Sequence, residues 1–310
     1  MNGFEKDFDF ILEKASSAKT PVKVVVAGAD AENILQAAFE AEAKGFAFPV
    51  LVGNEDRILK KLEKFNLKDR KYEICNVSDN ENVVQHSIDI INIGMGDVLM
   101  RGNTSTRDFL MPILHKGNKL IKNKLLSEVA MLKVPYYDKI LTLSDVSVLI
   151  RPSVEQRKLV IQNMVEVLNL LGIEHPSVAV LSLVEKPSFH MRDTVEAQSI
   201  VTAHKNHPIA DCEIVGPIPW DLIVSKEAAR LKDFDCPYCG EFDAICMPDV
   251  MAGNTLMKAL MMSADVNSSG IIAGATIPIA ITSRSSSKEH AYLSLATCIA
   301  LHEAQKKGKH

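Results

Sequence analysis

The sequence predicts an α/β protein with two α/β domains, each built on a mainly parallel sheet. Three observations lead to this prediction. Short apolar segments alternate with amphipathic ones, which is typical of βαβ units. The same alternation continues through the second half of the chain. The length of 310 residues suits about two domains.

In the first half, four strand-like segments each precede a helical segment. The predicted strands are PVKVVVAGA (21–29), FPVLVG (48–53), YEICNV (72–77) and GDVLMRG (96–102). The predicted helices cover residues 31–45, 55–66, 80–94 and 104–117. This order predicts parallel strands that are connected by helices.

In the second half, a long helix is predicted over residues 154–172, because Ser153 and Gln156 have the spacing of a capping box and Gly172 ends the apolar stripe. Four more strands are predicted at VAVLSLV (178–184), ADCEIVGPI (210–218), DAICMPDV (243–250) and GIIAGATIPIAITS (270–283). The last of these alternates Ile with small residues and is expected to be covered on both faces.

A final helix is predicted after residue 286, where Ser286 and Glu289 again have the form of a capping box. The strand-like segment near residues 138–152 suggests the domain boundary. We therefore expect a first domain of residues 1–140 plus 285–310, to which the last helix returns, and a second domain of residues 141–284.

Composition excludes several classes of function. The net charge of −4 gives no indication of a nucleic-acid or anionic membrane partner. No apolar run reaches the roughly 18 residues that a membrane helix needs, and the mixed-charge start is unlike a signal peptide, so a cytoplasmic location is expected. No Gly-x-Gly-x-x-Gly motif follows the first strand, and there is no Walker loop.

The six cysteines are expected to be reduced. Cys236-Pro-Tyr-Cys239 has the form of a dithiol redox motif, but it lies between a predicted helix and a strand and lacks the strand-then-helix setting of such motifs. His204 and His207 are too weak a pattern to predict a zinc site with it. We interpret the stretch as a surface loop and predict no metal site.

Three polar loops follow apolar strands, where open α/β sheets bind ligands. The first contains Thr104, Ser105, Thr106 and Arg107. Its hydroxyl groups suit either a helix cap or an oxyanion. Arg107 lies in the first helical turn, where its charge opposes the helix dipole, so a bound anion would explain it better than solvent does.

The second loop contains Asp249, Gly253, Asn254 and Lys258. Asn254 is predicted to be the N-cap of the next helix, and Lys258 lies one turn later on the same face. A plain cap with a solvated lysine is the alternative interpretation.

The third loop contains Thr282, Ser283 and Arg284, between the apolar strand and the final helix. Hydroxyl groups, an arginine and the free N–H groups of a helix start together suit an anion, above all phosphate. An ordinary capped turn remains the alternative.

Several stretches resemble the phosphate acetyltransferase/phosphate butyryltransferase family. They are GDVLMRGNTSTRDFLMPIL, VAVLSLVE, VGPIPWDLIVSKEAA, FDAICMPDVMAGNTLMKAL and SSGIIAGATIPIAITSRS. The most specific are the Pro-Asp-x3-Gly-Asn-x3-Lys pattern and the Ser-Arg pair after an apolar strand. The SKEAAR and TSRS segments resemble the butyryl branch more than the acetyl branch.

The resemblance implies an enzyme that exchanges a short-chain acyl group between coenzyme A and phosphate, with acyl phosphate as the other product. It implies no metal and no cofactor, since coenzyme A is a substrate. The implied fold resembles isocitrate and isopropylmalate dehydrogenases, with an inter-domain cleft, in a homodimer or larger homo-oligomer.

The resemblance also implies roles for individual residues. Ser283 would meet the thiol of coenzyme A, and Arg284 would hold the phosphate, so both are the predicted catalytic residues. The predicted substrate-binding residues are Thr104, Ser105, Thr106, Arg107, Asp249, Gly253, Asn254, Lys258, Thr282 and Glu289.

This sequence departs from the acetyl branch at two positions. That branch has a carboxylate six residues after the arginine as the proposed base, where this chain has His290 with Glu289 beside it. It also has Arg-Pro after the hydroxyl-rich loop, where this chain has Met111-Pro112, which leaves room for a larger acyl group. A metal- and NAD-dependent hydroxyacid dehydrogenase, or a non-catalytic acyl-CoA-binding protein, remain the alternatives.

Overall fold

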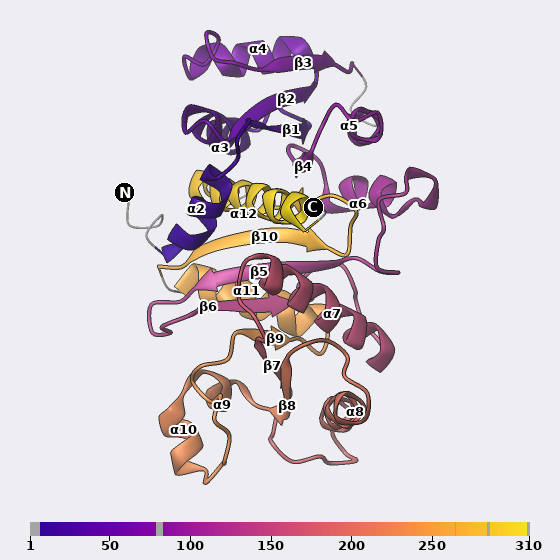
Figure 1. The fold of residues 1–310 in the computed structure, drawn as a ribbon, viewed down its shortest axis with the longest axis vertical. Coiled ribbons are helices and arrows are strands. Elements are labelled where there is room, and N and C mark those ends of the chain that lie inside the picture. Colours follow the sequence, from indigo (N-terminus) through magenta and orange to yellow (C-terminus); the bar gives the residue numbers. More distant parts are fainter. Residues whose placement is uncertain (1–6, 79–82, 264, 284–285, 309–310) are drawn as a thin grey trace. The chain divides into compact units, whose positions relative to one another are not determined.

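The computed structural model describes residues 7–78, 83–263, 265–283 and 286–308. The chain forms two compact units (Figure 1). Unit 1 comprises residues 1–122 and 269–310, and unit 2 comprises residues 123–268. Unit 1 is therefore built from both ends of the chain, and unit 2 from one continuous segment.

Unit 1 contains most of the predicted βαβ repeats. Its elements are α2 (Asp9–Ser16), β1 (Val22–Ala27), α3 (Glu32–Ala43), β2 (Ala47–Gly53), α4 (Glu55–Lys64), β3 (Glu73–Asn76), α5 (Val83–Asn92), β4 (Val98–Arg101), α6 (Thr106–Leu114), the short helix η1 (Lys116–Asn118), β10 (Asn267–Ala273, which begins at the end of unit 2), β11 (Ile279–Ala280) and α12 (Lys288–Lys307). The strand order is β3-β2-β1-β4-β11-β10. All neighbours are parallel except β10 and β11, which pair antiparallel.

The C-terminal helix α12 belongs to the core of unit 1. It packs against α2 and α3, and in Figure 1 the yellow helix lies among the indigo N-terminal elements. Every residue from Ala291 to Leu301 is buried. Burial on all sides explains why the helix lacks a narrow apolar stripe.

Unit 2 has its own hydrophobic core. Its elements are β5 (Ser127–Lys133), β6 (Ile140–Ser144), α7 (Val154–Leu170), β7 (Ser177–Leu181), α8 (Arg192–Asn206), β8 (Glu213–Ile218), α9 (Trp220–Val224), α10 (Lys226–Leu231), β9 (Ala244–Cys246) and α11 (Val250–Ser263). The strand order is β5-β6-β9-β7-β8, in which only β5 and β6 pair antiparallel. The predicted capping box at Ser153 and Gln156 is confirmed.

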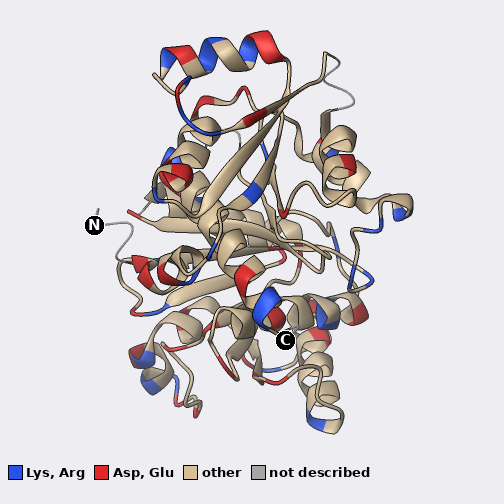
Figure 2. Cartoon of the chain, turned by 45° about the horizontal axis from the view of Figure 1, so that its top comes forward, with Lys and Arg blue, Asp and Glu red and all other residues tan. Residues whose placement is uncertain are grey.

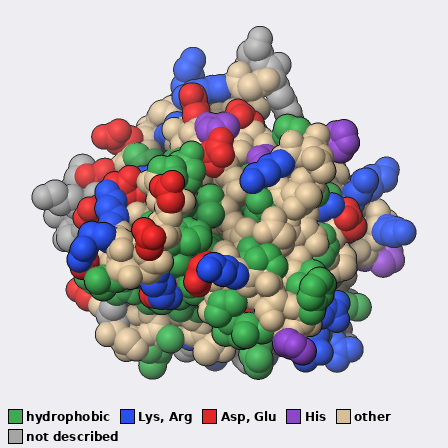
Figure 3. All heavy atoms as spheres, turned by 90° about the horizontal axis from the view of Figure 1, so that it is seen from below, with side chains coloured by type: hydrophobic (Ala, Val, Ile, Leu, Met, Phe, Trp, Pro, Cys, Tyr) green, Lys and Arg blue, Asp and Glu red, His purple; other side chains and the backbone are tan. Residues whose placement is uncertain are grey.

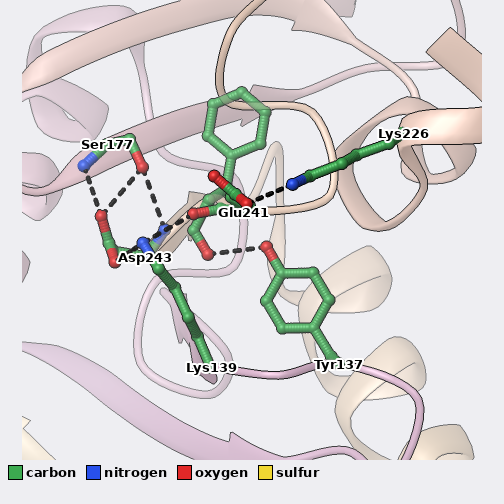
Figure 4. A network of polar contacts seen from close by, with 7 residues as sticks. Tyr137, Lys139, Ser177, Lys226, Glu241 and Asp243 are labelled. Carbon is green, nitrogen blue, oxygen red and sulfur yellow. Dashed lines mark hydrogen bonds and ion pairs between the residues drawn. The ribbon is translucent and has the colours of Figure 1, made fainter. Parts of the chain in front are cut away.

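A polar network joins residues at the starts of β6, β7 and β9 (Figure 4). One carboxylate oxygen of Asp243 accepts hydrogen bonds from the N–H and the hydroxyl group of Ser177, both at 2.9 Å. Its other oxygen accepts from Lys139 Nζ at 2.7 Å, and the buried Tyr137 hydroxyl donates to the Phe242 carbonyl at 2.8 Å. These bonds fix the amino ends of the central strands.

The fold class predicted from the sequence is confirmed, because both units are α/β with mainly parallel strands. Three differences from the sequence analysis concern the strands and the last helix. The expected single strand over residues 270–283 is two strands, because the segment between them leaves the sheet: Thr276 N–H donates to Leu120 O, and Lys122 N–H donates to Gly274 O. Strand β5 was not predicted, since its first residues, Ser127 and Glu128, are polar yet buried.

The third difference is the start of α12. Ser287, not Ser286, is the N-cap, and its hydroxyl accepts from His290 N–H at 3.1 Å. The bounds of the two units also differ from the expected domains of 1–140 plus 285–310 and 141–284. Strand β5 belongs with unit 2 because it pairs with β6, and β11 belongs with unit 1 because it pairs with β4.

Charged residues of both signs lie on the outer elements, as the colours along the ribbon in Figure 2 show. In α4, acidic residues occupy the first turn and basic residues the last, as the helix dipole favours. Seen from below, hydrophobic, charged and histidine side chains are intermixed on the surface (Figure 3). None of the helices in the described part of the chain combines the length and the apolar character that crossing a membrane needs.

Candidate active site

A buried arginine joins two loops in unit 1. Arg101, the last residue of β4, is only 5% exposed. Its Nε and Nη2 atoms donate to the Thr104 carbonyl at 3.0 and 2.6 Å, and Nη1 donates to the Thr282 carbonyl at 3.1 Å. We call residues 102–105 and 281–283 the unit 1 loop pair. The planar guanidinium fixes both loops at once, because it donates in two directions.

The loop pair lies at the carboxyl edge of the unit 1 sheet. Strands β1, β4 and β11 are parallel, so their carboxyl ends lie at one edge. Gly102 N–H donates to Ala27 O at 2.9 Å, and Asn103 N–H donates to Gly28 O at 2.7 Å. A Cβ atom on Gly102 would lie 2.1 Å from Gly28 O, so only glycine allows this close approach.

The predicted residues of the first loop differ in whether their side chains already make hydrogen bonds within the protein. The Thr104 hydroxyl is buried and has no hydrogen-bond partner within the described residues. Ser105 is the N-cap of α6: its hydroxyl accepts from Asp108 N–H at 3.0 Å and donates to the Asp108 carboxylate at 2.5 Å. Thr106 and Arg107 are exposed on the first turn of α6. Thr104, Thr106 and Arg107 therefore make no side-chain hydrogen bond to another described residue.

The third loop lies against the start of α3. Thr282 is buried, whereas Ser283 is exposed. The Ser286 carbonyl accepts from Asn33 Nδ2, at 2.9 Å, in the first turns of α3. Glu289 is half-buried in the first turn of α12. Arg284, the predicted phosphate ligand, lies outside the described residues.

The second predicted group lies in unit 2, on α11. Asp249, not Asn254, is the N-cap of this helix, because Asp249 Oδ1 accepts from Ala252 N–H at 2.8 Å. The helix begins at Val250, so the prediction that Asn254 caps it is wrong. Asn254 lies in the second turn, and its Nδ2 atom donates to the Val146 carbonyl at 3.0 Å.

The remaining two residues of this group have different roles in the structure. Gly253 is buried, and a Cβ atom there would lie 2.6 Å from Asp145 O and 3.2 Å from Val146 Cα. Glycine therefore lets α11 lie directly on the backbone of the loop that follows β6. Lys258 is exposed, one turn after Asn254.

The loop after β6, residues 145–150, is organised by one carboxylate that sequence reasoning missed. Asp145 is 3% exposed and accepts the N–H groups of Glu128 at 2.8 Å and Leu149 at 2.6 Å, with longer bonds from Ser147 and Val148. Burial raises the pKa of Asp145, and these backbone donors offset part of that effect. An Asp directly after a strand was its only signal in the sequence.

The cysteines offer no accessible nucleophile near these residues. Cys246, at the end of β9, is fully buried, and burial raises the pKa of its thiol, with the nearby Arg157 guanidinium only partly offsetting this. Cys236 and Cys239 lie between α10 and β9, as the sequence indicated. Cys239, however, is buried in the core of unit 2 and is not a surface residue.

The structure favours a structural role for His204. Its Nδ1 atom accepts from Ile209 N–H at 3.0 Å, so its Nε2 atom donates to Cys212 O, also at 3.0 Å. The described residues contain no group of three or more His, Cys, Asp or Glu side chains that could hold a metal ion.

Comparison with known proteins places these residues in a family context. Residues 84–299 match the family model described as "Phosphate acetyl/butaryl transferase". This range contains every residue of the three predicted loops. The chain is 31% identical to a phosphate butyryltransferase of Clostridium acetobutylicum over 94% of this chain and 96% of the relative. It is 31% identical to a phosphate acetyltransferase of Thermotoga maritima over 88% of this chain and 93% of the relative.

Solved structures show the same fold. A branched-chain phosphotransacylase from Enterococcus faecalis superposes with a TM-score of 0.80 at 28% identity, covering 91% of this chain and 99% of the other. A putative 4-hydroxythreonine-4-phosphate dehydrogenase from Salmonella typhimurium gives a TM-score of 0.56 at 13% identity, over 91% of this chain and 100% of the other. The second likeness shows a shared dehydrogenase-like fold alone.

Proposed function

The chain belongs to the phosphate acetyl/butyryl transferase family and is a phosphotransacylase, and from this premise we propose that it exchanges a short-chain acyl group between coenzyme A and phosphate. A phosphate oxygen attacks the thioester carbonyl carbon, the C–S bond breaks, and the thiolate leaves and takes up a proton. In reverse, the thiolate attacks the acyl phosphate, the C–O bond breaks, and phosphate leaves. Both substrates react directly, without an acyl-enzyme.

The observation that carries the proposal is the unit 1 loop pair, held by Arg101 within the matched residues. The unused hydroxyl of Thr104 and the exposed Ser283 are oxyanion donors at a strand carboxyl edge. We propose that Thr104 and Arg107 contact the acyl phosphate, and that Ser283 donates to the thiolate as it develops.

Arg284 would hold the phosphate through two parallel hydrogen bonds. Arg284→Lys keeps the charge but loses the planar fork, so we expect activity to fall by at least about tenfold, the scale of one charge-assisted hydrogen bond. Arg284→Gln should lose more. Steady-state kinetics for both substrates and a melting curve on each variant test this; near-normal kinetics for Arg284→Gln would place the phosphate elsewhere.

We propose a butyryl-sized or similar short acyl group as the preferred substrate. Met111 occupies the position at which the acetyl branch has arginine, and an apolar side chain there suits a longer alkyl chain better. The relative from Clostridium acetobutylicum is named a phosphate butyryltransferase, which supports this choice. A homodimer or larger assembly stays a prediction, to be measured by light scattering.

The deciding experiment measures thiol release from acetyl-, propionyl- and butyryl-CoA, each with and without phosphate and with a chelator present. We expect phosphate-dependent release of coenzyme A without added metal. Folded protein that releases no thiol with any of the three would overturn the proposal. Binding without release would indicate a non-catalytic acyl-CoA-binding protein, and reduction of NAD with hydroxyacids would indicate a dehydrogenase.

A further inference from the structure

The side-chain amide of Asn254 has a fixed orientation. Its Nδ2 atom donates to the carbonyl oxygen of Val146 at 3.0 Å. A carbonyl oxygen can only accept, so the NH2 end of the amide must face Val146. The Oδ1 atom therefore points away from the loop, and no described residue donates a hydrogen bond to it. Asn254 is half-buried, so this acceptor remains accessible.

The Val146 carbonyl cannot easily rotate to allow the opposite orientation. The preceding residue, Asp145, is held by backbone donors on both sides of its carboxylate, including Glu128 N–H and Leu149 N–H. The end of the loop is tied to α11 as well, because Val250 N–H donates to Ile150 O at 3.3 Å. If the amide of Asn254 were flipped, its Oδ1 atom would face the carbonyl oxygen of Val146. That carbonyl would then lose its hydrogen bond, which costs free energy.

We infer that Asn254 Oδ1 accepts a hydrogen bond from an amide N–H of the pantetheine arm of coenzyme A. The inference rests on the proposed function and assigns Asn254 to one of its two substrates. Because Asn254 Oδ1 can only accept a hydrogen bond, it favours a ligand that has a hydrogen-bond donor. Pantetheine has amide N–H groups, an acyl phosphate dianion has no N–H or O–H donor, and inorganic phosphate near neutral pH keeps about one O–H group.

The charges around Asn254 favour the same assignment. The Asp249 carboxylate lies at the start of the same helix, where it would repel a phosphate group. Lys258 lies one turn further along, about 6 Å by helix rise. It is exposed and has no ion pair among the described residues. A ligand with neutral amide groups followed by anionic phosphates, as in coenzyme A, matches this order along α11.

The first test separates the two substrates kinetically. Asn254→Ala should raise KM for coenzyme A about three- to tenfold, the effect of one hydrogen bond, and leave KM for phosphate or acyl phosphate unchanged. Thr255→Ala, which alters the exposed neighbour on the same helix, is the matched control and should change neither value. A raised KM for phosphate alone would overturn the inference.

The second test leaves the protein unchanged and alters the ligand. Two coenzyme A analogues, each with one pantetheine amide replaced by an ester, lack one N–H donor. One of them should bind the wild-type protein about three- to tenfold more weakly than coenzyme A does. The Asn254→Ala variant should bind this analogue and coenzyme A with equal affinity. Equal losses in wild type and variant for both analogues would overturn the inference. Absent activity of wild type with coenzyme A itself would instead overturn the proposed function.

Discussion

Arg101 acts on two loops from a buried position, and a single substitution tests this. Arg101→Lys keeps a positive charge but offers one ammonium group in place of a planar fork. It cannot reach the carbonyls of Thr104 and Thr282 in the same geometry. We expect turnover to fall by about tenfold or more, because the loop pair loses its alignment at the reacting atoms.

The control for this variant is Arg230→Lys, an exposed arginine that pairs with Glu227 on its own helix. It should leave both turnover and melting temperature close to wild type. Kinetics at a temperature well below the melting point of each variant separate alignment from unfolding. Wild-type turnover in Arg101→Lys would show that the two loops hold their positions without it.

The sequence revealed the loops but not the residue that joins them. Thr104 and Thr282 were identified because each follows an apolar strand. Arg101 lies in the same strand segment as the first loop, but the order of residues does not show that its side chain is buried. Nor does it show that this side chain donates to a carbonyl 181 residues away in the sequence. Ser105 shows the converse: a Ser-x-x-Asp spacing already indicates a helix cap, and the structure uses it so.

His175 should make stability depend on pH. Its ring nitrogens meet Asp211 at 2.8 Å and Glu213 at 3.3 Å, which raises its pKa, chiefly through Asp211. Because the pKa of His175 is higher in the folded state, its contacts add to the free energy of unfolding in full below the unfolded-state pKa of about 6.5. This stabilisation is lost as the pH rises through the folded-state pKa. The melting temperature of His175→Gln should therefore lie further below wild type at pH 6 than at pH 9.

The His175 side chain is exposed, so salt should weaken this difference. Melting curves at both pH values, in low and high salt, measure it. A difference between wild type and His175→Gln that is the same at pH 6 and pH 9 would contradict the assignment.

At the scale of elements, helix starts were less predictable than helices. The segment from Asp249 to Asn254 contains two good capping residues, and local preference alone favours either. The structure selects Asp249, because starting the helix there brings Gly253 against the Asp145 backbone. Tertiary packing therefore determines which of two residues with similar capping preference becomes the N-cap.

Gly253→Ala tests this packing. The added Cβ would lie 2.6 Å from Asp145 O, so α11 must move away from the loop or the loop must shift. We expect a lower melting temperature and a raised KM for coenzyme A, because Asn254 would lose its position. Gly308→Ala is the control, since its nearest neighbour would lie at 3.8 Å. A melting temperature at or above wild type for Gly253→Ala would show that the helix has room.

The loop that contains Cys236 and Cys239 should matter for stability and not for catalysis. Cys239 is 3% exposed and packs in the core of unit 2, and burial raises its pKa to about 12, so it stays a protonated, apolar thiol. Cys239→Ser should lower the melting temperature more than Cys236→Ser, because the hydroxyl is buried without its water contacts. Both variants should keep wild-type turnover. Zinc that copurifies at one ion per chain would contradict this interpretation.

At the scale of the whole molecule, the alternation of strands and helices was enough to predict the α/β class, because the spacing of apolar residues within each segment indicates a strand or a helix. Strand β5 and the β10–β11 pair were not predictable in the same way. Strand β11 is only two residues long and pairs with the distant β4 as well as with β10, and β5 begins with buried polar side chains. The bounds of the units depend on these pairings, so they too required the structure.

The return of the chain to unit 1 leads to a last prediction. Removing residues 288–310 deletes α12, whose buried Leu293, Leu295 and Ile299 lie in the core of unit 1. Each such side chain is worth about 1.5–3 kcal/mol, so their loss is comparable with the roughly 5–15 kcal/mol that stabilises a domain. Unit 1 should therefore unfold.

Unit 2 has its own hydrophobic core, and its chain is continuous, so it should survive this truncation. Limited proteolysis followed by mass spectrometry should give a resistant fragment near residues 123–268, with cleavage spread through the first 122 residues. Removing only residues 308–310 is the control and should give the wild-type pattern. Resistance of the N-terminal segment in the longer truncation would mean that unit 1 folds without the helix that the end of the chain supplies.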